Sequence, residues 1–195
     1  MSSKANSRSR ELKSGKAKST STKARPAPAK KPSVRPAAHE GQEPDLAAAR
    51  RVVLDLLAIR GGSGDEKAVA ERIVKWLREA GCPKSAIAFD EAHTKTPLKG
   101  NVGNLIVKLP GTLAGPRRLL MAHMDTVPVC LGAKPVVTGR FVKSADPTTG
   151  LGADDRAGCA VVLSTALEIL RRKLPHPPLT FFFRSEEHTS ELQSR

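Results

Sequence analysis

The chain has 195 residues and a formal net charge of +14, with 33 Lys or Arg against 19 Asp or Glu. That length accommodates one domain of ordinary size with some chain left over. No apolar run approaches the ~20 residues of a membrane-spanning helix, and the first thirty residues contain no signal-peptide core, so we expect neither a membrane segment nor a secretory leader. The 3 cysteines form no C-x-x-C pair, which favours a reducing, cytoplasmic setting.

Residues 1–44 differ in composition from the rest of the chain. They hold eleven Lys or Arg and three Glu, and no aromatic residue. Such a segment cannot bury enough apolar surface to offset the entropy cost of ordering, so we predict a disordered basic tail. Its "RPAPAKKPSVRP" stretch favours polyproline-type stiffness. Two uses stay open, a solvated tail without a dedicated partner and weak contact with nucleic acid or another polyanion.

Two amphipathic helices are predicted next. Residues 45–59 place apolar side chains along one stripe, with Asp45 as the expected N-terminal cap. After the "RGGSG" break, Ser63 and Glu66 match the S-x-x-E pattern of a capping box, and apolar residues recur at helical spacing up to residue 80. Trp76 lies on that apolar face, so we expect it to pack in the core.

Shorter apolar runs follow and predict strands. They lie at residues 86–90, 104–109, 118–123 and 179–183, and helical periodicity returns over residues 157–173. Mixed strands and helices in this order predict an α/β fold, specifically a three-layer α/β/α domain with a central sheet that spans residues 45–183.

His123 and Asp125 follow the predicted strand at residues 118–123, in the stretch "LLMAHMDTVPV". Open α/β sheets usually keep their binding residues at this end of a strand. In an extended chain, side chains two positions apart point the same way. The two residues can therefore converge on one ligand, or the carboxylate can fix the tautomer of a metal-bound imidazole. Both arrangements stay open.

Asp154 and Asp155 are adjacent carboxylates in the Gly-rich stretch "LGADDRAG", directly before the predicted helix at 157–173. Acidic residues at a helix start often serve as caps. A carboxylate there can also bridge two metal ions, because zinc accepts imidazole and carboxylate ligands together.

The stretch "AHMDTVP" followed by "LGADDRAG", together with "GGSGDEKAVAERIVKWLREAG" and "GNLIVKLPG", resembles the peptidase T-like branch of the co-catalytic zinc exopeptidases. Relatives of this branch include glutamate carboxypeptidase, acetylornithine deacetylase and succinyl-diaminopimelate desuccinylase. The resemblance implies His123 as a zinc ligand, Asp125 as the catalytic-site residue that orients it, and Asp154 as the carboxylate that bridges two zinc ions. It also implies a cis peptide bond between Asp154 and Asp155.

The same resemblance implies a reaction and partners. Family chemistry is hydrolysis of a peptide or related amide by a metal-activated water, with two Zn²⁺ ions per site and a nearby Glu as general base. The expected substrate is a small peptide or an N-acyl amino acid. We further expect no membrane partner, a homodimer of the complete enzyme and a cytoplasmic location.

Glu186 and Glu187 match the family's adjacent Glu pair, which supplies the general base and a metal ligand. One residue fewer than the family places there separates them from the strand at 179–183, and such a slip turns side chains to the opposite face. In addition, "RSEEHTSELQS" resembles the translation of a DNA-sequencing adapter.

We therefore expect residues 184–195 to be non-native read-through and the chain to be an N-terminal fragment. Such a fragment is expected to bind a single metal ion weakly and to be inactive. The alternative from another class is a basic nucleic-acid- or polyanion-binding protein with a non-catalytic α/β domain. Salt-dependent DNA binding that is lost when residues 1–44 are deleted would favour this alternative over the hydrolase.

Overall fold

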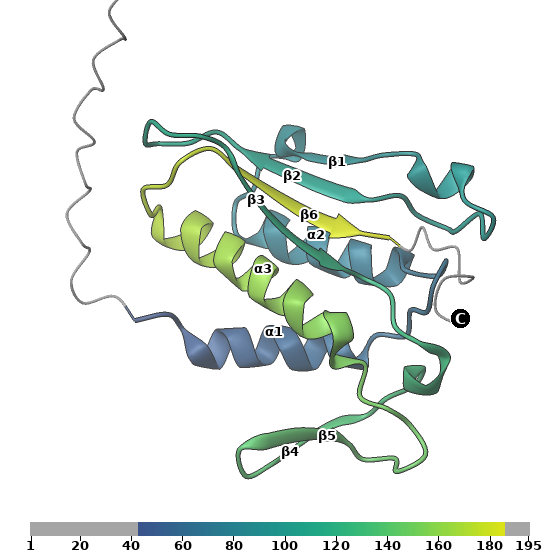
Figure 1. Ribbon diagram of the computed structural model, residues 1–195. Coiled ribbons are helices and arrows are strands. Elements are labelled where there is room, and N and C mark those ends of the chain that lie inside the picture. The colour runs from purple at the N-terminus through teal and green to yellow at the C-terminus, as the bar shows by residue number, and fades with distance from the viewer. Residues whose placement is uncertain (1–42, 186–195) are drawn as a thin grey trace, which may run out of the picture. The chain divides into compact units, whose positions relative to one another are not determined.

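The computed structural model describes residues 43–185 of the chain. In this part the elements are α1 (Leu46–Ala58), α2 (Lys67–Glu79), β1 (Ile87–Phe89), β2 (Leu105–Leu109), β3 (Arg118–His123), β4 (Pro135–Thr138), β5 (Phe141–Ser144), α3 (Ala153–Arg172) and β6 (Leu179–Arg184), with short 3₁₀ turns between them (Figure 1). Each predicted helix and strand is present. The predicted tail, except for residues 43 and 44, lies outside the described residues, as do Glu186 and Glu187.

Four strands form one sheet in the order β1-β2-β6-β3. The β1–β2 and β2–β6 pairs are antiparallel, whereas β6 and β3 run parallel. The parallel register sets His123 beside Arg184, the last residue of β6. The carboxyl ends of β3 and β6 therefore lie side by side at the same end of the sheet. The residues that follow β3 begin at this end.

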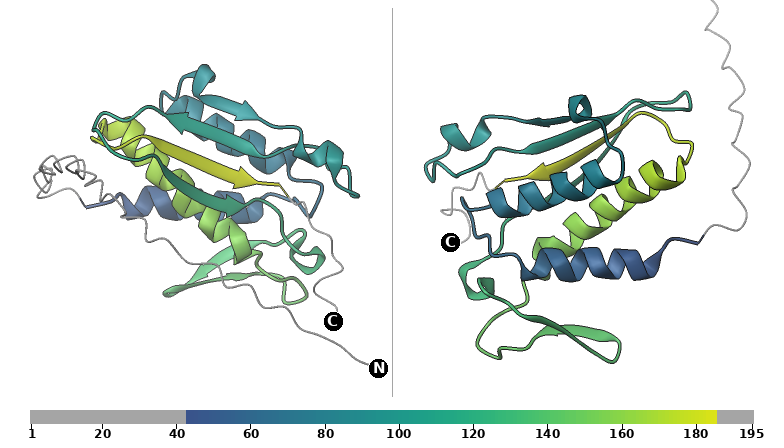
Figure 2. Two further views of the ribbon diagram at one scale, coloured as in Figure 1. Left: turned by 45° about the horizontal axis from the view of Figure 1, so that its top comes forward. Right: turned by 180° about the vertical axis from the view of Figure 1, so that it is seen from behind.

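All three described helices lie on the same side of this sheet, with α1 packed on α3 (Figure 2). Alternate strand residues face them and are buried with the helix side chains, among them Leu105, Val107, Leu109, Ala122, Phe181 and Phe183. The neighbouring positions point the other way, so Leu119 and Met121 are 59% and 56% exposed. The α/β class is thus confirmed, and residues 43–185 show the sheet with helices on one of its two faces.

The start of α1 agrees with its sequence pattern. Asp45 accepts a hydrogen bond from the backbone N–H of Ala48 at 2.8 Å, which confirms the predicted cap. Trp76 on α2 packs against the core from its margin. Its indole Nε1 donates to Asp55 at 3.0 Å, and the same carboxylate forms an ion pair with Arg72. The indole thus packs against the core and links α2 to α1 through its hydrogen bond to Asp55.

The predicted capping box at α2 is wrong. The helix begins at Lys67 with Glu66 as its N-cap residue, whose side chain makes no capping hydrogen bond, and Asn101 Oδ1 accepts from the N–H of Lys67 at 3.1 Å. Ser63 instead donates its hydroxyl to Asp125 at 2.8 Å, while Glu66 accepts from the N–H of Gly64 at 2.9 Å. The S-x-x-E pattern therefore organises the loop before α2 and leaves the Ser63 hydroxyl for another partner.

Strands β4 and β5 pair as an antiparallel hairpin that sequence reasoning missed. The stretch "PVVTGRFVKS" carries the signal, since two β-branched and aromatic runs flank a Gly-Arg turn. Gly139 has a φ of 59° at that turn, a conformation glycine adopts at little cost. The hairpin joins β3 to α3 below the main sheet (Figure 1). Of the helices in residues 43–185, none has the length and apolarity to cross a membrane.

Candidate functional site

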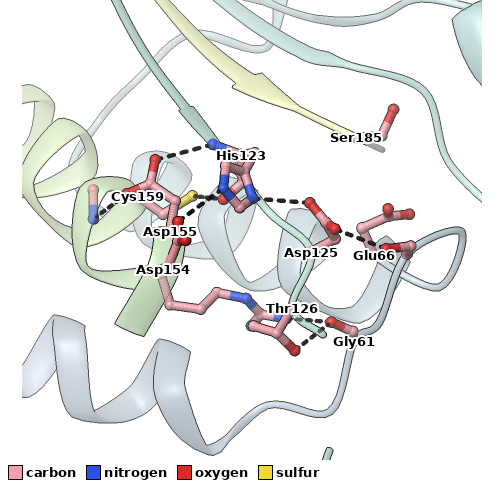
Figure 3. Close-up of polar contacts among 12 residues, drawn as sticks. Gly61, Glu66, His123, Asp125, Thr126, Asp154, Asp155, Cys159 and Ser185 are labelled. Carbon is pink, nitrogen blue, oxygen red and sulfur yellow. Dashed lines mark hydrogen bonds and ion pairs between the residues drawn. The ribbon is translucent and has the colours of Figure 1, made fainter. Parts of the chain in front are cut away.

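His123 ends β3 and is oriented by Asp125 (Figure 3). Its Nδ1–H donates to the Asp125 carboxylate at 2.9 Å, and the Asp125 side chain is only 7% exposed. Of the two arrangements that the sequence leaves open, the structure has the one in which the carboxylate orients the imidazole. A buried negative charge at this distance favours the protonated ring, so Asp125 raises the pKa of His123 to about 9, against the opposing effect of burial.

Asp154 approaches the other nitrogen of the same ring. His123 Nε2 lies 3.1 Å from Asp154 Oδ1, although the two residues are 31 positions apart. The Asp154 side chain is 97% exposed, so its carboxylate faces solvent as well as the imidazole. Zinc bonds of about 2.0–2.2 Å at a tetrahedral angle put a nitrogen and an oxygen ligand about 3.3 Å apart. The spacing of this donor pair therefore fits one shared zinc ion.

Asp155 has a different part from its neighbour. Its carboxylate accepts from the N–H of Gly158 at 3.1 Å, as a cap of the regular turns of α3 that follow a kink at Asp154 and Asp155, and from the N–H of His123 at 3.3 Å. A Cβ at Gly158 would lie 2.1 Å from Asp155 Oδ1, so only glycine fits there. The peptide bond between Asp154 and Asp155 is cis, as the resemblance implies. One carboxylate of the pair thus fixes the backbone while the other faces the imidazole.

The loop between α1 and α2 is held against this site by a buried guanidinium. Arg156 is 1% exposed and donates to the carbonyl oxygens of Leu56 and Gly61, each at 2.9 Å. Thr126 donates to the same Gly61 oxygen through its N–H and its hydroxyl, each at 3.2 Å. Residue 61 is therefore fixed both to the start of α3 and to the loop that follows β3.

Sequence reasoning gave no site role to Ser63, Thr126 or Arg156. Their contacts join positions 62 to 100 residues apart. Hydrophobic periodicity in the sequence cannot predict contacts between residues so far apart. The "GGSG" break directly before α2 was the available signal, because glycines around a polar residue allow close backbone approach.

Cys159 supports the site from inside α3. Its thiol donates to the carbonyl oxygen of His123 at 3.1 Å. Burial raises the pKa of this thiol to about 12, so it stays protonated at neutral pH and is unsuited to act as a nucleophile. Its part is structural, and it fixes the backbone at the end of β3.

The described residues bring one pair of ligand-type side chains together at the candidate site. Within residues 43–185, no group of three or more His, Cys, Asp or Glu is arranged to hold a metal ion. Catalytic zinc sites use three protein ligands. Among the three predicted site residues, His123 and Asp154 form the ligand-type pair and Asp125 lies behind the imidazole. Their roles at a metal stay predictions.

Comparisons with known proteins support a peptidase-type hydrolase. Residues 104–195 match peptidase family M28. The structure resembles a tripeptidase from Staphylococcus aureus, with a TM-score of 0.62 and 30% identity over 74% of this chain and 40% of that one. It also resembles the aminopeptidase PepT from Bacillus cereus, with a TM-score of 0.61 and 27% identity over 69% of this chain and 35% of that one.

The name of one similar curated protein states no activity. The uncharacterized protein YqjE from Bacillus subtilis is 38% identical over 93 residues, which is 48% of this chain and 25% of that protein. The chain thus spans two fifths or less of the length of each relative named here.

Proposed function

We propose that the chain forms part of the catalytic domain of a zinc-dependent exopeptidase or amide hydrolase of the peptidase T-like kind. One observation carries this proposal. His123 Nε2 and Asp154 Oδ1 converge at 3.1 Å, while Asp125 holds the opposite ring nitrogen at 2.9 Å. One carboxylate fixes the imidazole, and a second carboxylate faces its other nitrogen. This is the arrangement expected of a zinc ligand and its supporting residue.

In this proposal each residue has a defined task. His123 would hold one zinc ion through Nε2, Asp154 would be the carboxylate shared by two zinc ions, and Asp125 keeps the proton on Nδ1. When bound, the zinc pair supplies a water of lowered pKa and polarises the scissile carbonyl. A general base and further ligands are needed beyond residues 43–185, so we propose that the 195-residue chain binds zinc weakly and does not hydrolyse peptides.

The substrate class follows from the same family resemblance. We propose that the complete enzyme cleaves small peptides or N-acyl amino acids, works in the cytoplasm and is a homodimer. The names of the tripeptidase and the aminopeptidase that this structure resembles support peptides as the substrate class.

Zinc titration by calorimetry tests the proposal directly. We expect the unmodified chain to bind Zn²⁺ at one site, and His123→Ala to weaken binding at least about a hundredfold because a direct ligand is lost. Asp154→Asn should weaken it about tenfold or more, since the amide carries no negative charge. The matched control is His176→Gln, because His176 hydrogen-bonds to the carbonyl oxygen of Pro177 and has no part in the proposed site.

Two outcomes would contradict the proposal. Zinc binding that survives His123→Ala, or that His176→Gln weakens equally, would show that the ion binds elsewhere. Zinc-dependent cleavage of a tripeptide by the unmodified chain, abolished by His123→Ala, would support the peptidase class but contradict the proposed inactivity.

Polyanion binding is a second candidate, favoured by the charge distribution. Residues 1–44 hold eleven Lys or Arg against three Glu, within a total charge of +14. We expect binding to a DNA duplex that weakens steeply with salt, since each neutralised phosphate releases a counterion. Deletion of residues 1–44 should reduce this affinity at least about tenfold at 50 mM salt, as measured by fluorescence anisotropy. Equal affinity of the two forms would exclude the basic segment as the binding site.

A further inference from the structure

Ser63 makes one side-chain contact that points into the candidate metal site. Its hydroxyl donates to Asp125 Oδ2 at 2.8 Å, whereas Asp125 Oδ1 accepts from His123 Nδ1 at 2.9 Å. The two oxygens of one carboxylate thus serve two different donors. The Ser63 hydroxyl, the buried Asp125 carboxylate and the His123 imidazole thus form a continuous row that ends at Asp154. Figure 3 shows the part of this row from Asp125 to Asp154.

The loop that carries Ser63 is fixed on its N-terminal side. The Gly61 carbonyl oxygen accepts from Arg156 and from Thr126, and Gly62 forms an isolated parallel bridge with Thr126. Because Thr126 directly follows Asp125, the same backbone segment holds both the loop and the carboxylate. Arg156 and Thr126, which are both almost completely buried, therefore set the position of the Ser63 hydroxyl relative to Asp125.

The loop is also fixed on its C-terminal side. Glu66 accepts from the N–H of Gly64, and the N–H of Asn101 donates to the Gly64 carbonyl oxygen at 2.9 Å. Gly64 has a φ of +80°, in the region that favours glycine. Ser63 thus lies between two anchored glycines, and its hydroxyl does not serve the helix cap that its sequence pattern suggests.

We propose that Ser63 is a positioning residue of the metal site, which acts on His123 through Asp125. This inference deepens the proposed function and rests on it for the zinc part. A donor on each oxygen restricts the rotation of a carboxylate about its Cβ–Cγ bond. The Ser63 hydroxyl fixes the plane of Asp125, and Asp125 in turn fixes the imidazole that presents Nε2. Supporting partners of this kind influence metal affinity although they do not touch the metal.

Two readouts on the full chain test the inference, and they use the same variants. The first is the Nδ1–H proton of His123 in the metal-free protein, followed by NMR at constant pH. We expect Ser63→Ala to accelerate its exchange with solvent at least about threefold, because the acceptor carboxylate gains rotational freedom. The second is Zn²⁺ affinity, which Ser63→Ala should lower about tenfold.

The variants Ser63→Thr and Ser164→Ala serve as controls. Threonine retains the hydroxyl and should restore both readouts to within about twofold. Ser164 lies on α3, and its hydroxyl has no hydrogen-bond partner among the described residues, so its removal should change neither readout. Ser63 is exposed, so Ser63→Ala should fold normally, which circular dichroism checks.

The outcomes separate this inference from the proposed function. If Ser63→Ala behaves like Ser164→Ala in both readouts, Ser63 is not a positioning residue, even where zinc binding depends on His123. If the unmodified chain binds no zinc but Ser63→Ala still accelerates exchange of the Nδ1 proton, the positioning role stands and the zinc proposal fails. An effect that Ser63→Thr does not rescue would overturn the inference, because it would show that the side chain acts by packing rather than by its hydroxyl.

Discussion

Raising the pH from about 6.5 to about 8.5 is expected to strengthen the apparent zinc affinity of the chain about a hundredfold. The reason is the pKa of His123, which Asp125 raises to about 9. Below that pH a proton occupies Nε2, and zinc can bind only after it leaves. Each pH unit below the pKa therefore costs about tenfold in affinity, and the curve levels off only near pH 9. Calorimetry in non-chelating buffers at constant ionic strength measures the slope.

Asp125→Asn provides the matched comparison. The hydrogen bond to Asp125 is the largest cause of the raised pKa, so its loss should move the pKa of His123 back toward the ordinary value of about 6.5. The affinity of this variant should then change little above about pH 7, while that of the unmodified chain still rises. A wild-type curve that is already flat between about pH 7 and 8.5 would contradict a pKa of His123 as high as about 9.

The same titration fixes the sign of a stability effect in the metal-free protein. A histidine with a raised pKa stabilises the fold in its protonated form. The contribution is therefore fully present below about pH 6.5 and declines as the pH rises through about 9. Zinc at the proposed site would act in the opposite direction, because its binding would replace the proton as the pH rises. Metal-free and zinc-loaded protein should thus show opposite pH trends in thermal stability.

The sequence was sufficient for the helices and for the strands of the main sheet, but not for the hairpin of β4 and β5. Periodicity located the helices and the strands of the main sheet, and the family resemblance of "AHMD" and "LGADD" implied that His123 and Asp154 lie together, as they do. The sequence did not show which of the two adjacent aspartates caps α3, because their side chains are identical and both suit a helix start. The structure assigns the cap to Asp155 through its bond to the Gly158 N–H.

The errors have a common physical origin. Ser63 was interpreted as a helix cap because local patterns consider only neighbours in sequence, and its partner Asp125 lies 62 positions away. The short hairpin of β4 and β5 was missed because exposed strands lack the apolar alternation that marks a strand at the core. The assignment of residues 184–195 as read-through stays a prediction. Arg184 ends β6, and Ser185 is buried and donates to Asn104 at 3.0 Å.

Phe183→Ala is expected to destabilise the chain by about 3–5 kcal/mol, whereas Phe182→Ala should cost about 1 kcal/mol. Phe183 is fully buried, and its register places it between Leu105 and Ala122 on the helix-covered face. Phe182 points to the other face and lies beside Met121, which is 56% exposed. The two substitutions remove the same side chain from one strand, so their difference isolates the cavity left behind.

Urea unfolding followed by circular dichroism measures both values. A loss of about 3–5 kcal/mol is a large share of the 5–15 kcal/mol that stabilises an ordinary domain, so Phe183→Ala should shift the midpoint strongly. Equal losses for the two variants would contradict a sheet with one open face, and would mean that the second face is buried by association. Size-exclusion chromatography across protein concentrations would then reveal a concentration-dependent oligomer. A small loss for Phe183→Ala alone would contradict the packing of β6 against α3, on which the position of the whole candidate site depends.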